Sequence, residues 1–209
     1  MFCVVRNAIL QLARLEDGLQ VFGFLVFTDM TSPIYAVYGG GCHFGACSEI
    51  PMSEWIAHGG RLNPLALKSN GVSYEKWLQW MNDDEHEDTC PPESVPQTIY
   101  FAVRDDGKLI GAVTIRTKPN EKINNGSGGG HLGFGVRPTE RRKGYAKKIL
   151  RLALKKLAER GINDVMINCA SDNIGSEKTI LACGATFQDE VINDEGERAK
   201  RFWIYDNIV

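Results

Sequence analysis

The most constraining feature is a long amphipathic segment in the second half of the chain. Its apolar residues recur at i, i+3, i+4, i+7, i+8 and i+11, namely Ala146, Ile149, Leu150, Ala153, Leu154 and Leu157. This spacing predicts one apolar helix stripe, with Gly161 as its C-terminal cap. The stretch 131–137 before it reads as a strand stopped by Pro138, and 164–169 after it as a buried strand. Together these three elements make a strand–helix–strand unit, whose connection is right-handed if its two strands are parallel.

The neighbouring segments predict further alternation of helices and strands. An Asp-Gly turn joins the expected strands 98–104 and 109–116, which is typical of a β-hairpin. A short helix over 173–182 and strands over 186–191 and 199–208 complete the C-terminal part. Two helices are expected between Pro51 and Met81, opened by Met52 or Ser53 and by Ser73. A weak helical pattern covers 9–19, but residues 1–50 stay unassigned.

Composition narrows the class of protein. A chain of 209 residues that is 43% hydrophobic fits one globular domain. A net charge of −2 argues against coating nucleic acid by bulk charge, and charged residues interrupt every apolar run, so no membrane span is expected. Six cysteines without a CxxC pair favour a reducing, cytoplasmic setting. The cluster Cys42, His43, Cys47 and His58 fits no zinc spacing, so no metal is expected.

Positive charge gathers where the long helix begins. Arg141, Arg142 and Lys143 precede Gly144, at the helix end whose dipole prefers anions, so helix stability alone does not select these cations. Unpaired helix N–H groups, a glycine that permits close approach and added cations together predict a phosphate site. A solvated basic face is the alternative.

The motif Arg141-x-x-Gly144-x-Ala146 between a strand and a long helix resembles the pyrophosphate loop of GNAT N-acetyltransferases, which bind acetyl-CoA. The downstream stretch 173–187 is similar to the family's following helix. The resemblance is firmest over 96–209, weaker from Pro51, and closest to an uncharacterised bacterial group. It implies an α/β (α+β) domain over 51–209, whose central mixed, mainly antiparallel sheet is splayed between two parallel strands and flanked by helices.

The resemblance also implies the cofactor site. Backbone N–H groups of residues 142–146 would hold the pyrophosphate, and the strand edge at Phe134, Gly135 and Val136 would pair with the pantetheine arm. The full expected set is Phe134, Gly135, Val136, Arg141, Arg142, Lys143, Gly144, Tyr145, Ala146, Asn173 and Ser176. Asn173 is expected to cap its helix, and the N–H of Val136 to donate to the oxyanion.

The catalytic residues are less constrained by the family pattern. His131 stands where several members place a glutamate that acts as general base through water, and the alternative is a histidine that hydrogen-bonds the glycine loop. The family's usual general acid is a tyrosine seven residues after the helix-opening Asn, where this chain has Ile180. The thiolate would then take its proton from water, from Ser176, from Cys169 or from a tyrosine elsewhere in the chain, and the sequence does not distinguish these sources.

Two further groups of residues are candidates for contacting the acceptor amine. Trp55, Tyr74, Trp77 and Trp80 belong to the segment that forms one wall of the acceptor site in the family, but their helical spacing favours a core role. The acidic run within 83–88 would attract a cationic amine, and solvated loop charge is the simpler interpretation.

The function expected from the resemblance is transfer of the acetyl group of acetyl-CoA to a primary amine of a small molecule or peptide, by direct attack in a ternary complex. Acetyl-CoA is the co-substrate, with no metal, nucleic acid or membrane partner. A homodimer stays open, because family members often dimerise. The missing tyrosine favours a rival, an acyl-CoA sensor without turnover, and a nucleic-acid binder using the basic helix is the less favoured third hypothesis.

Overall fold

The computed structural model describes residues 12–14, 19–23, 52–58, 63–64, 71–72, 74–92, 94–104, 108–121, 123–127 and 129–206. Eight strands form two sheets in this part of the chain. The larger sheet has the order β1-β2-β3-β4-β5, with β1 (Leu12–Arg14), β2 (Leu19–Gly23), β3 (Gln97–Arg104), β4 (Leu109–Arg116) and β5 (Leu132–Val136). The smaller has the order β6-β8-β7, with β6 (Val165–Ala170), β7 (Thr186–Ile192) and β8 (Arg198–Ile204).

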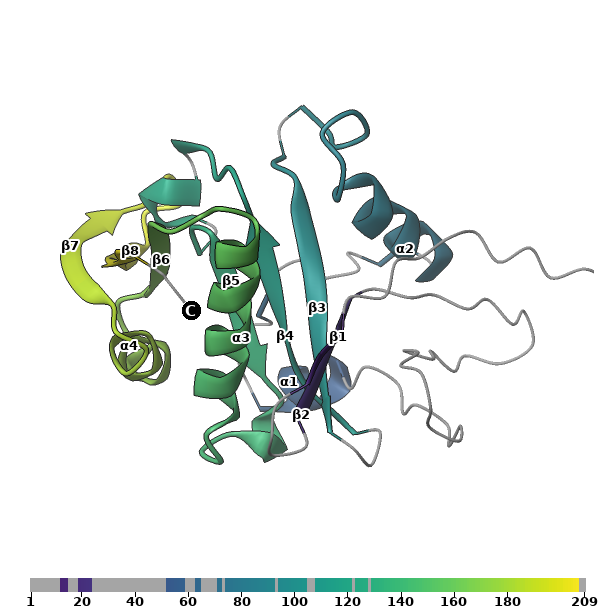
Figure 1. Cartoon of the computed structure of the whole chain (residues 1–209), viewed down its shortest axis with the longest axis horizontal. Coiled ribbons are helices and arrows are strands. Elements are labelled where there is room, and N and C mark those ends of the chain that lie inside the picture. The colour runs from purple at the N-terminus through teal and green to yellow at the C-terminus, as the bar shows by residue number, and fades with distance from the viewer. Residues whose placement is uncertain are drawn as a thin grey trace, which may run out of the picture.

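The sheet parts between β5 and β6, which confirms the predicted splay and extends it to a division into two sheets (Figure 1). Every ladder within the two sheets is antiparallel. A bridge between Gly130 and Ile167 joins them just before β5 begins. The split is therefore closed near the start of β5 and widens toward its end.

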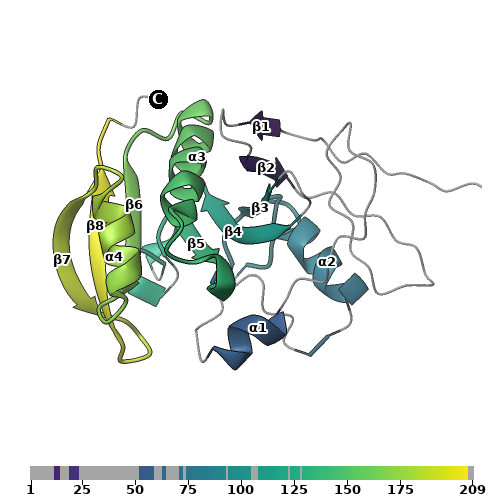
Figure 2. The same ribbon diagram turned by 90° about the horizontal axis from the view of Figure 1, so that it is seen from below.

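Four helices flank the sheets: α1 (Met52–Ala57), α2 (Tyr74–Asp83), α3 (Tyr145–Glu159) and α4 (Ile174–Leu181). Figure 2 shows α3 on one face of the larger sheet and α1 and α2 on the other, while α4 lies against the smaller sheet. The predicted stripe of α3 is confirmed, because Ile149, Leu150 and Leu157 are fully buried in the main core. Gly161 follows the helix with φ +78°, as a C-terminal glycine should.

The hairpin, the two helices before it and the C-terminal strands are confirmed with small shifts at their ends. Ser73, predicted to cap the second of these helices, lies outside the described residues, as does most of the 1–50 segment. The structure differs within 9–19, because residues 12–14 form β1 and Leu19 begins β2, and these two strands extend the edge of the sheet beyond β3. Tertiary pairing overrides a weak local pattern in such cases. The predicted loop 118–130 contains a π-helical turn, Ile123–Ser127.

Candidate active site

A cavity of about 850 Å³ opens at the wide end of the split. It is bounded by the end of β5, the loop 141–146 that begins α3, the end of β6 and the first turns of α4. Its walls comprise Trp55, Asn63, Phe134, Gly135, Val136, Glu140, Arg141, Arg142, Gly144, Tyr145, Ala146, Lys147, Ala170, Asp172, Asn173, Gly175, Ser176, Lys178 and Thr179. The cavity thus brings together two stretches, 134–147 and 170–179, with Trp55 and Asn63.

The β5 wall presents backbone groups to this space. Two bonds fix its register with β4: Arg137 N–H donates to Ile110 O (2.8 Å), and Arg116 N–H donates to His131 O (2.9 Å). Because antiparallel bonds alternate along a ladder, Gly135 pairs with β4 while the amides of Phe134 and Val136 face away from it. β5 is also the edge strand of its sheet. An extended ligand can therefore pair with it at Phe134 and Val136.

The start of α3 forms the second wall. Gly144 occupies the N-cap position in a left-handed conformation, φ +85°, with no side-chain cap from the described residues. Arg142 also has a positive φ, +64°, which is unusual for a residue with a side chain. These two conformations turn the chain sharply into the helix and leave its first N–H groups to an external acceptor.

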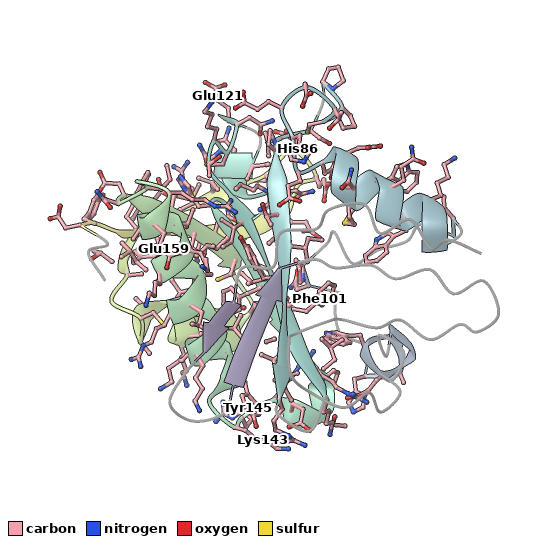
Figure 3. The ribbon with its side chains drawn as sticks, turned by 45° about the vertical axis from the view of Figure 1, so that its right-hand side comes forward. His86, Phe101, Glu121, Lys143, Tyr145 and Glu159 are labelled. Carbon is pink, nitrogen blue, oxygen red and sulfur yellow. The ribbon has the colours of Figure 1, made fainter. Side chains whose placement is uncertain are left out.

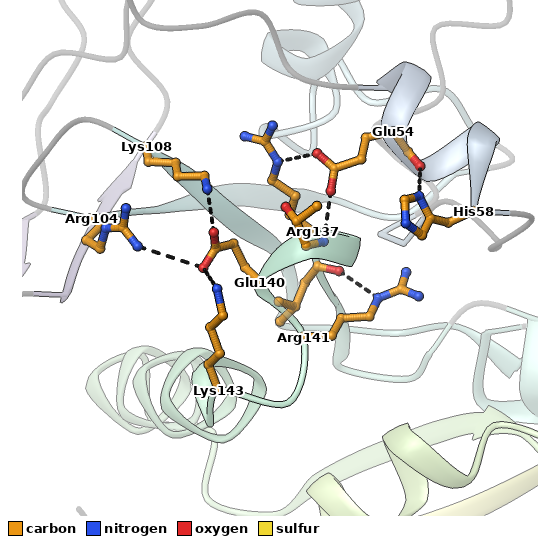
Figure 4. A network of polar contacts seen from close by, with 10 residues as sticks. Glu54, His58, Arg104, Lys108, Arg137, Glu140, Arg141 and Lys143 are labelled. Atoms are coloured by element: carbon orange, nitrogen blue, oxygen red, sulfur yellow. Dashed lines mark hydrogen bonds and ion pairs between the residues drawn. The ribbon is translucent and has the colours of Figure 1, made fainter.

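Ion pairs and hydrogen bonds hold this loop from behind (Figure 4). Arg141 Nε donates to Val136 O at 3.2 Å. Lys143, predicted to bind the cofactor, lies outside the described cavity lining, and its Nζ donates instead to Glu140 (3.0 Å). Glu140 is 2% exposed and also accepts from Lys108 Nζ at 2.5 Å. The hydrogen bonds from Lys108 and Lys143 hold the pKa of Glu140 below its usual value, so it is a carboxylate at neutral pH.

The start of α4 is built differently. The Oδ1 of Asn173 accepts from the backbone N–H of Ser176 at 3.1 Å, which confirms Asn173 as the helix cap. Both residues line the cavity. With Lys178 and Thr179, these two residues are the polar side chains that α4 and its cap bring to the cavity wall.

His131 lies at the closed end of the split, outside the cavity lining that the structure describes. Its Nδ1 accepts a hydrogen bond from the backbone N–H of Met166 at 3.1 Å. Only the neutral ring with its proton on Nε2 has the free Nδ1 lone pair that this bond requires. Burial lowers the pKa of His131 from 6.5, and the charge of Arg116 adds to the shift. This geometry favours a structural role for His131, because the neutral ring keeps its proton on Nε2, although the ring contacts β6 at Met166 and not the glycine loop that the alternative named.

The position of the family's tyrosine offers no hydroxyl. Ile180 is completely buried in the main core. Cys169, one of the substitutes considered, is half-buried on β6, and burial raises the pKa of its thiol to about 11. It stays protonated at neutral pH but lies outside the described lining, whereas Ser176 lines the cavity.

Sequence reasoning did not place Trp55 and Asn63 at the cofactor cavity. Trp55, assigned to the core, is 1% exposed and also lines the cavity, and Asn63 lines it beside β5. A Cβ on Gly135 would stand 2.0 Å from Asn63 O, so a glycine is required there by close packing. No local spacing relates these residues to the 141–146 loop. Lys147 and Lys178 were also missed, although Lys147 follows the motif directly.

The other predicted acceptor-side groups have structural partners. Trp77 is 4% exposed, as a core residue should be, and the side chain of Tyr74 lies outside the described residues. In the acidic run, Asp84 Oδ2 accepts from Gln97 Nε2 (2.8 Å), and burial raises the pKa of Asp84. Figure 3 places His86 of this run at the end of the molecule opposite Lys143 and Tyr145.

No group of three metal-ligating side chains occurs in the described ranges, and Cys42, His43 and Cys47 fall outside them. His58, within them, bonds Glu54 O through its Nδ1 (2.9 Å). Of the cysteines that the structure describes, Cys169 and Cys183 are free thiols. In the same part of the chain, none of the helices has the length and apolar character needed to cross a membrane.

Solved structures similar to this chain are acetyltransferases. A chimera of spermidine N-acetyltransferase SpeG from Vibrio cholerae with hSSAT is 16% identical, with a TM-score of 0.50, over 66% of this chain and 80% of that one. SpeG from Vibrio cholerae in complex with CoA and spermine is 16% identical, with a TM-score of 0.48, over 66% of this chain and 79% of that one. Ribosomal-protein-S5-alanine acetyltransferase from Vibrio fischeri is 16% identical, with a TM-score of 0.44, over 53% of this chain and 62% of that one. The first of these likenesses supports the fold.

A search of curated protein sequences found no significant match. The model of the acetyltransferase (GNAT) family matches residues 66–185, more than half of the chain, and this range includes β5, the 141–146 loop, α3 and α4. The resemblance noted in the 141–146 motif is thereby confirmed over a much longer stretch. The chain belongs to the GNAT family of acetyltransferases.

Proposed function

We propose that this acetyltransferase transfers the acetyl group of acetyl-CoA directly to a primary amine of a small molecule or peptide. One observation carries the proposal: the uncapped start of α3 and the outward-facing amides of β5 border the same cavity. The first suits a pyrophosphate and the second an amide-bearing arm. CoA carries both groups in one molecule.

The cofactor is proposed to bind through two walls and one helix. The amides of residues 142–146 would hold the pyrophosphate, with Arg141, Arg142 and Lys147 adding positive charge. The N–H of Phe134 would pair with the pantetheine arm, and the N–H of Val136 is kept for the oxyanion of the reaction. Asn173 would contact the cofactor through its side-chain nitrogen, because its Oδ1 is already occupied.

In the proposed reaction the uncharged amine nitrogen attacks the thioester carbonyl carbon, and its proton passes to water. The N–H of Val136 donates to the oxyanion. The C–S bond then breaks, and the thiolate takes a proton from the Ser176 hydroxyl, which we propose as a relay because it takes a proton in turn from the water that accepted the amine's proton. Positioning supplies most of the acceleration, since orientation alone can contribute about 7–11 kcal/mol. His131 is proposed to fix the start of β5 rather than to take the amine's proton.

The second candidate is an acyl-CoA sensor without turnover. The complete burial of Ile180 favours it, because the family's usual hydroxyl is absent at this position and the described core leaves no room for one. The two candidates share the cofactor and differ in turnover.

Two experiments separate the candidates. Titration calorimetry at physiological salt should detect acetyl-CoA binding and no comparable binding of RNA. Thiol release is then measured with spermidine, spermine, amino acids, aminoglycosides and peptides with free N-termini. Turnover with any amine supports the enzyme, and binding without turnover across the panel supports the sensor. Failure to bind acetyl-CoA would overturn both acyl-CoA functions.

A further inference from the structure

A carboxylate from α1 is bonded to the segment that leads into the 141–146 loop (Figure 4). Glu54 Oε1 accepts from the backbone N–H of Thr139 at 2.8 Å, and its Oε2 accepts from Arg137 Nε at 2.5 Å. Both partners belong to the short stretch between β5 and the loop. These bonds span more than 80 residues of sequence.

The same helix contributes to the cavity wall. Trp55 follows Glu54 directly, is 1% exposed and lines the cavity. α1 therefore contacts the base of the loop through one residue and the cavity through the next. A movement of the loop on binding an anion would reach Trp55 through Glu54.

The charge of Glu54 gives a second argument. Burial opposes its ionisation, but the hydrogen bond from Thr139 N–H and the bond and charge of Arg137 outweigh it and lower the pKa to about 2. It is a carboxylate at neutral pH. A negative charge beside an anion site disfavours the anion by simple electrostatics. Its benefit to such a site must then come from position.

We propose that Glu54 is a positioning residue that ties α1 to the 137–146 segment, so that CoA binding at the loop is transmitted to the cavity wall at Trp55. The inference rests on the proposed function, since it takes CoA as the ligand of the loop. It adds coupling between the cofactor wall and the wall contributed by Trp55 and Asn63. Coupling of this kind is reciprocal, so an acceptor held by that wall tightens CoA binding by the same factor.

The first test is the affinity of the full chain for CoA, measured by calorimetry. Glu54→Gln keeps an oxygen for Thr139 N–H but loses the charge-assisted bond to Arg137. We expect affinity about five- to tenfold lower. If Glu54 acted on CoA only through its negative charge, Glu54→Gln would bind CoA more tightly than the wild type. Unchanged or tighter CoA binding by Glu54→Gln would therefore overturn the proposal.

Two control variants isolate the cause. Glu87→Gln makes the same charge change in an exposed pair with Lys118, and His86 beside it lies at the opposite end of the molecule (Figure 3). We expect CoA affinity unchanged within about twofold. Glu54→Asp keeps the charge but is too short to hold both partners, and it should weaken CoA binding as well. Thermal unfolding confirms that each variant is folded, and Glu54→Asp carries the test if Glu54→Gln is not.

The second test reads the coupling itself. The contribution of Trp55 to the fluorescence change on adding saturating CoA is obtained by subtracting the same titration of Trp55→Phe. We expect a change in the wild type that falls by at least about half in the Glu54→Gln background. An equal change in both backgrounds overturns the inference and leaves the proposed function standing. Absence of CoA binding by the wild type overturns the proposed function itself.

Discussion

Two helices begin at the same cavity, and the chain treats their exposed N–H groups in opposite ways. At α4 the Asn173 side chain accepts from Ser176 N–H, as in an ordinary capped helix. At α3 the N-cap is Gly144, which offers no side chain and holds φ +85°, and three cations precede it. One start is completed by a side chain of the protein, and the other, which has no side-chain cap among the described residues, is the one we propose for an anionic ligand. Met166 N–H and Thr139 N–H, satisfied by His131 and Glu54, belong with the first kind.

This comparison separates two costs. Removing a side chain that satisfies an N–H group should reduce the free energy of unfolding and change CoA affinity little. Obstructing the N–H groups left open should reduce CoA affinity with little loss of stability. Glu54 is the exception we propose, because its partner lies at the base of the open start.

The largest effect is expected at Gly144. Asn and Asp both tolerate its left-handed conformation better than other residues, and a Cβ there meets no atom within 4 Å. Gly144→Asp places a negative charge at the proposed phosphate site, so CoA should bind about 100-fold more weakly than to Gly144→Asn. Calorimetry measures both affinities, and thermal unfolding should show Gly144→Asp as the equally or more stable of the two because it favours the helix dipole. Equal CoA affinities would mean that the start of α3 is not the anion site.

The next effect is expected at His131. His131→Ala leaves the buried N–H of Met166 without its partner and should lower the free energy of unfolding by about 1–3 kcal/mol. His131→Asn, which supplies an oxygen, should recover part of it. The folded pKa lies below 6.5, so the unfolded chain binds the proton first, and stability contributed by neutral His131 is lost as pH falls below about 6.5. Denaturant unfolding across pH should show this loss reduced in His131→Asn.

The same variants test the role of His131 in acetyl transfer. With an amine that the enzyme acetylates, the pH profile of kcat/KM should keep its shape in His131→Asn. The reason is that the His131 ring is hydrogen-bonded to Met166 and lies outside the described cavity lining. Loss of an ionisation from that profile would restore His131 as general base.

A smaller effect is expected at the capped start. Asn173→Ala removes the acceptor for Ser176 N–H and should cost about 1 kcal/mol of stability. CoA affinity should fall by no more than about fivefold, the value of one neutral hydrogen bond from the side-chain nitrogen. Asn173→Ser should restore the stability without that bond. A loss of CoA affinity as large as that of Gly144→Asp would erase the distinction between the two helix starts.

Sequence reasoning succeeded where the determinants are local. The stripe from Ala146 to Leu157 fixes α3, and the Arg141–Ala146 motif and the cap at Asn173 each depend on residues a few positions apart. These elements supply the loop wall and the α4 wall of the cavity. Spacing of three or four residues is set by helix geometry, and it can therefore be read without knowing the rest of the fold.

Sequence reasoning failed where a contact joins segments that are distant in the chain. Glu54 meets Arg137 and Thr139 across more than 80 residues, and Asn63 packs against Gly135, without any pattern that relates them. The role of His131 depends on the amide of Met166, which β6 brings to it from 35 residues away. A weak helical pattern covers 9–19, yet residues 12–14 and 19–23 are strands that pair with each other and with β3. Such choices are made by tertiary contacts that local composition does not encode.

The smallest effect concerns the strained residue at the open start. Arg142 holds φ +64°, a conformation that costs a residue with a side chain about 1–2 kcal/mol, while glycine loses about 0.5–1 kcal/mol in chain entropy. Arg142→Gly should therefore raise the free energy of unfolding by no more than about 1 kcal/mol. It also removes an exposed cation from the cavity wall, which should weaken CoA binding about two- to fivefold. Arg142→Gln keeps the strain and removes the same charge, so it should weaken CoA binding equally without the gain in stability. If the two variants differ in CoA affinity by more than their charge allows, the backbone at residue 142, and not its side chain, sets the geometry of the open helix start.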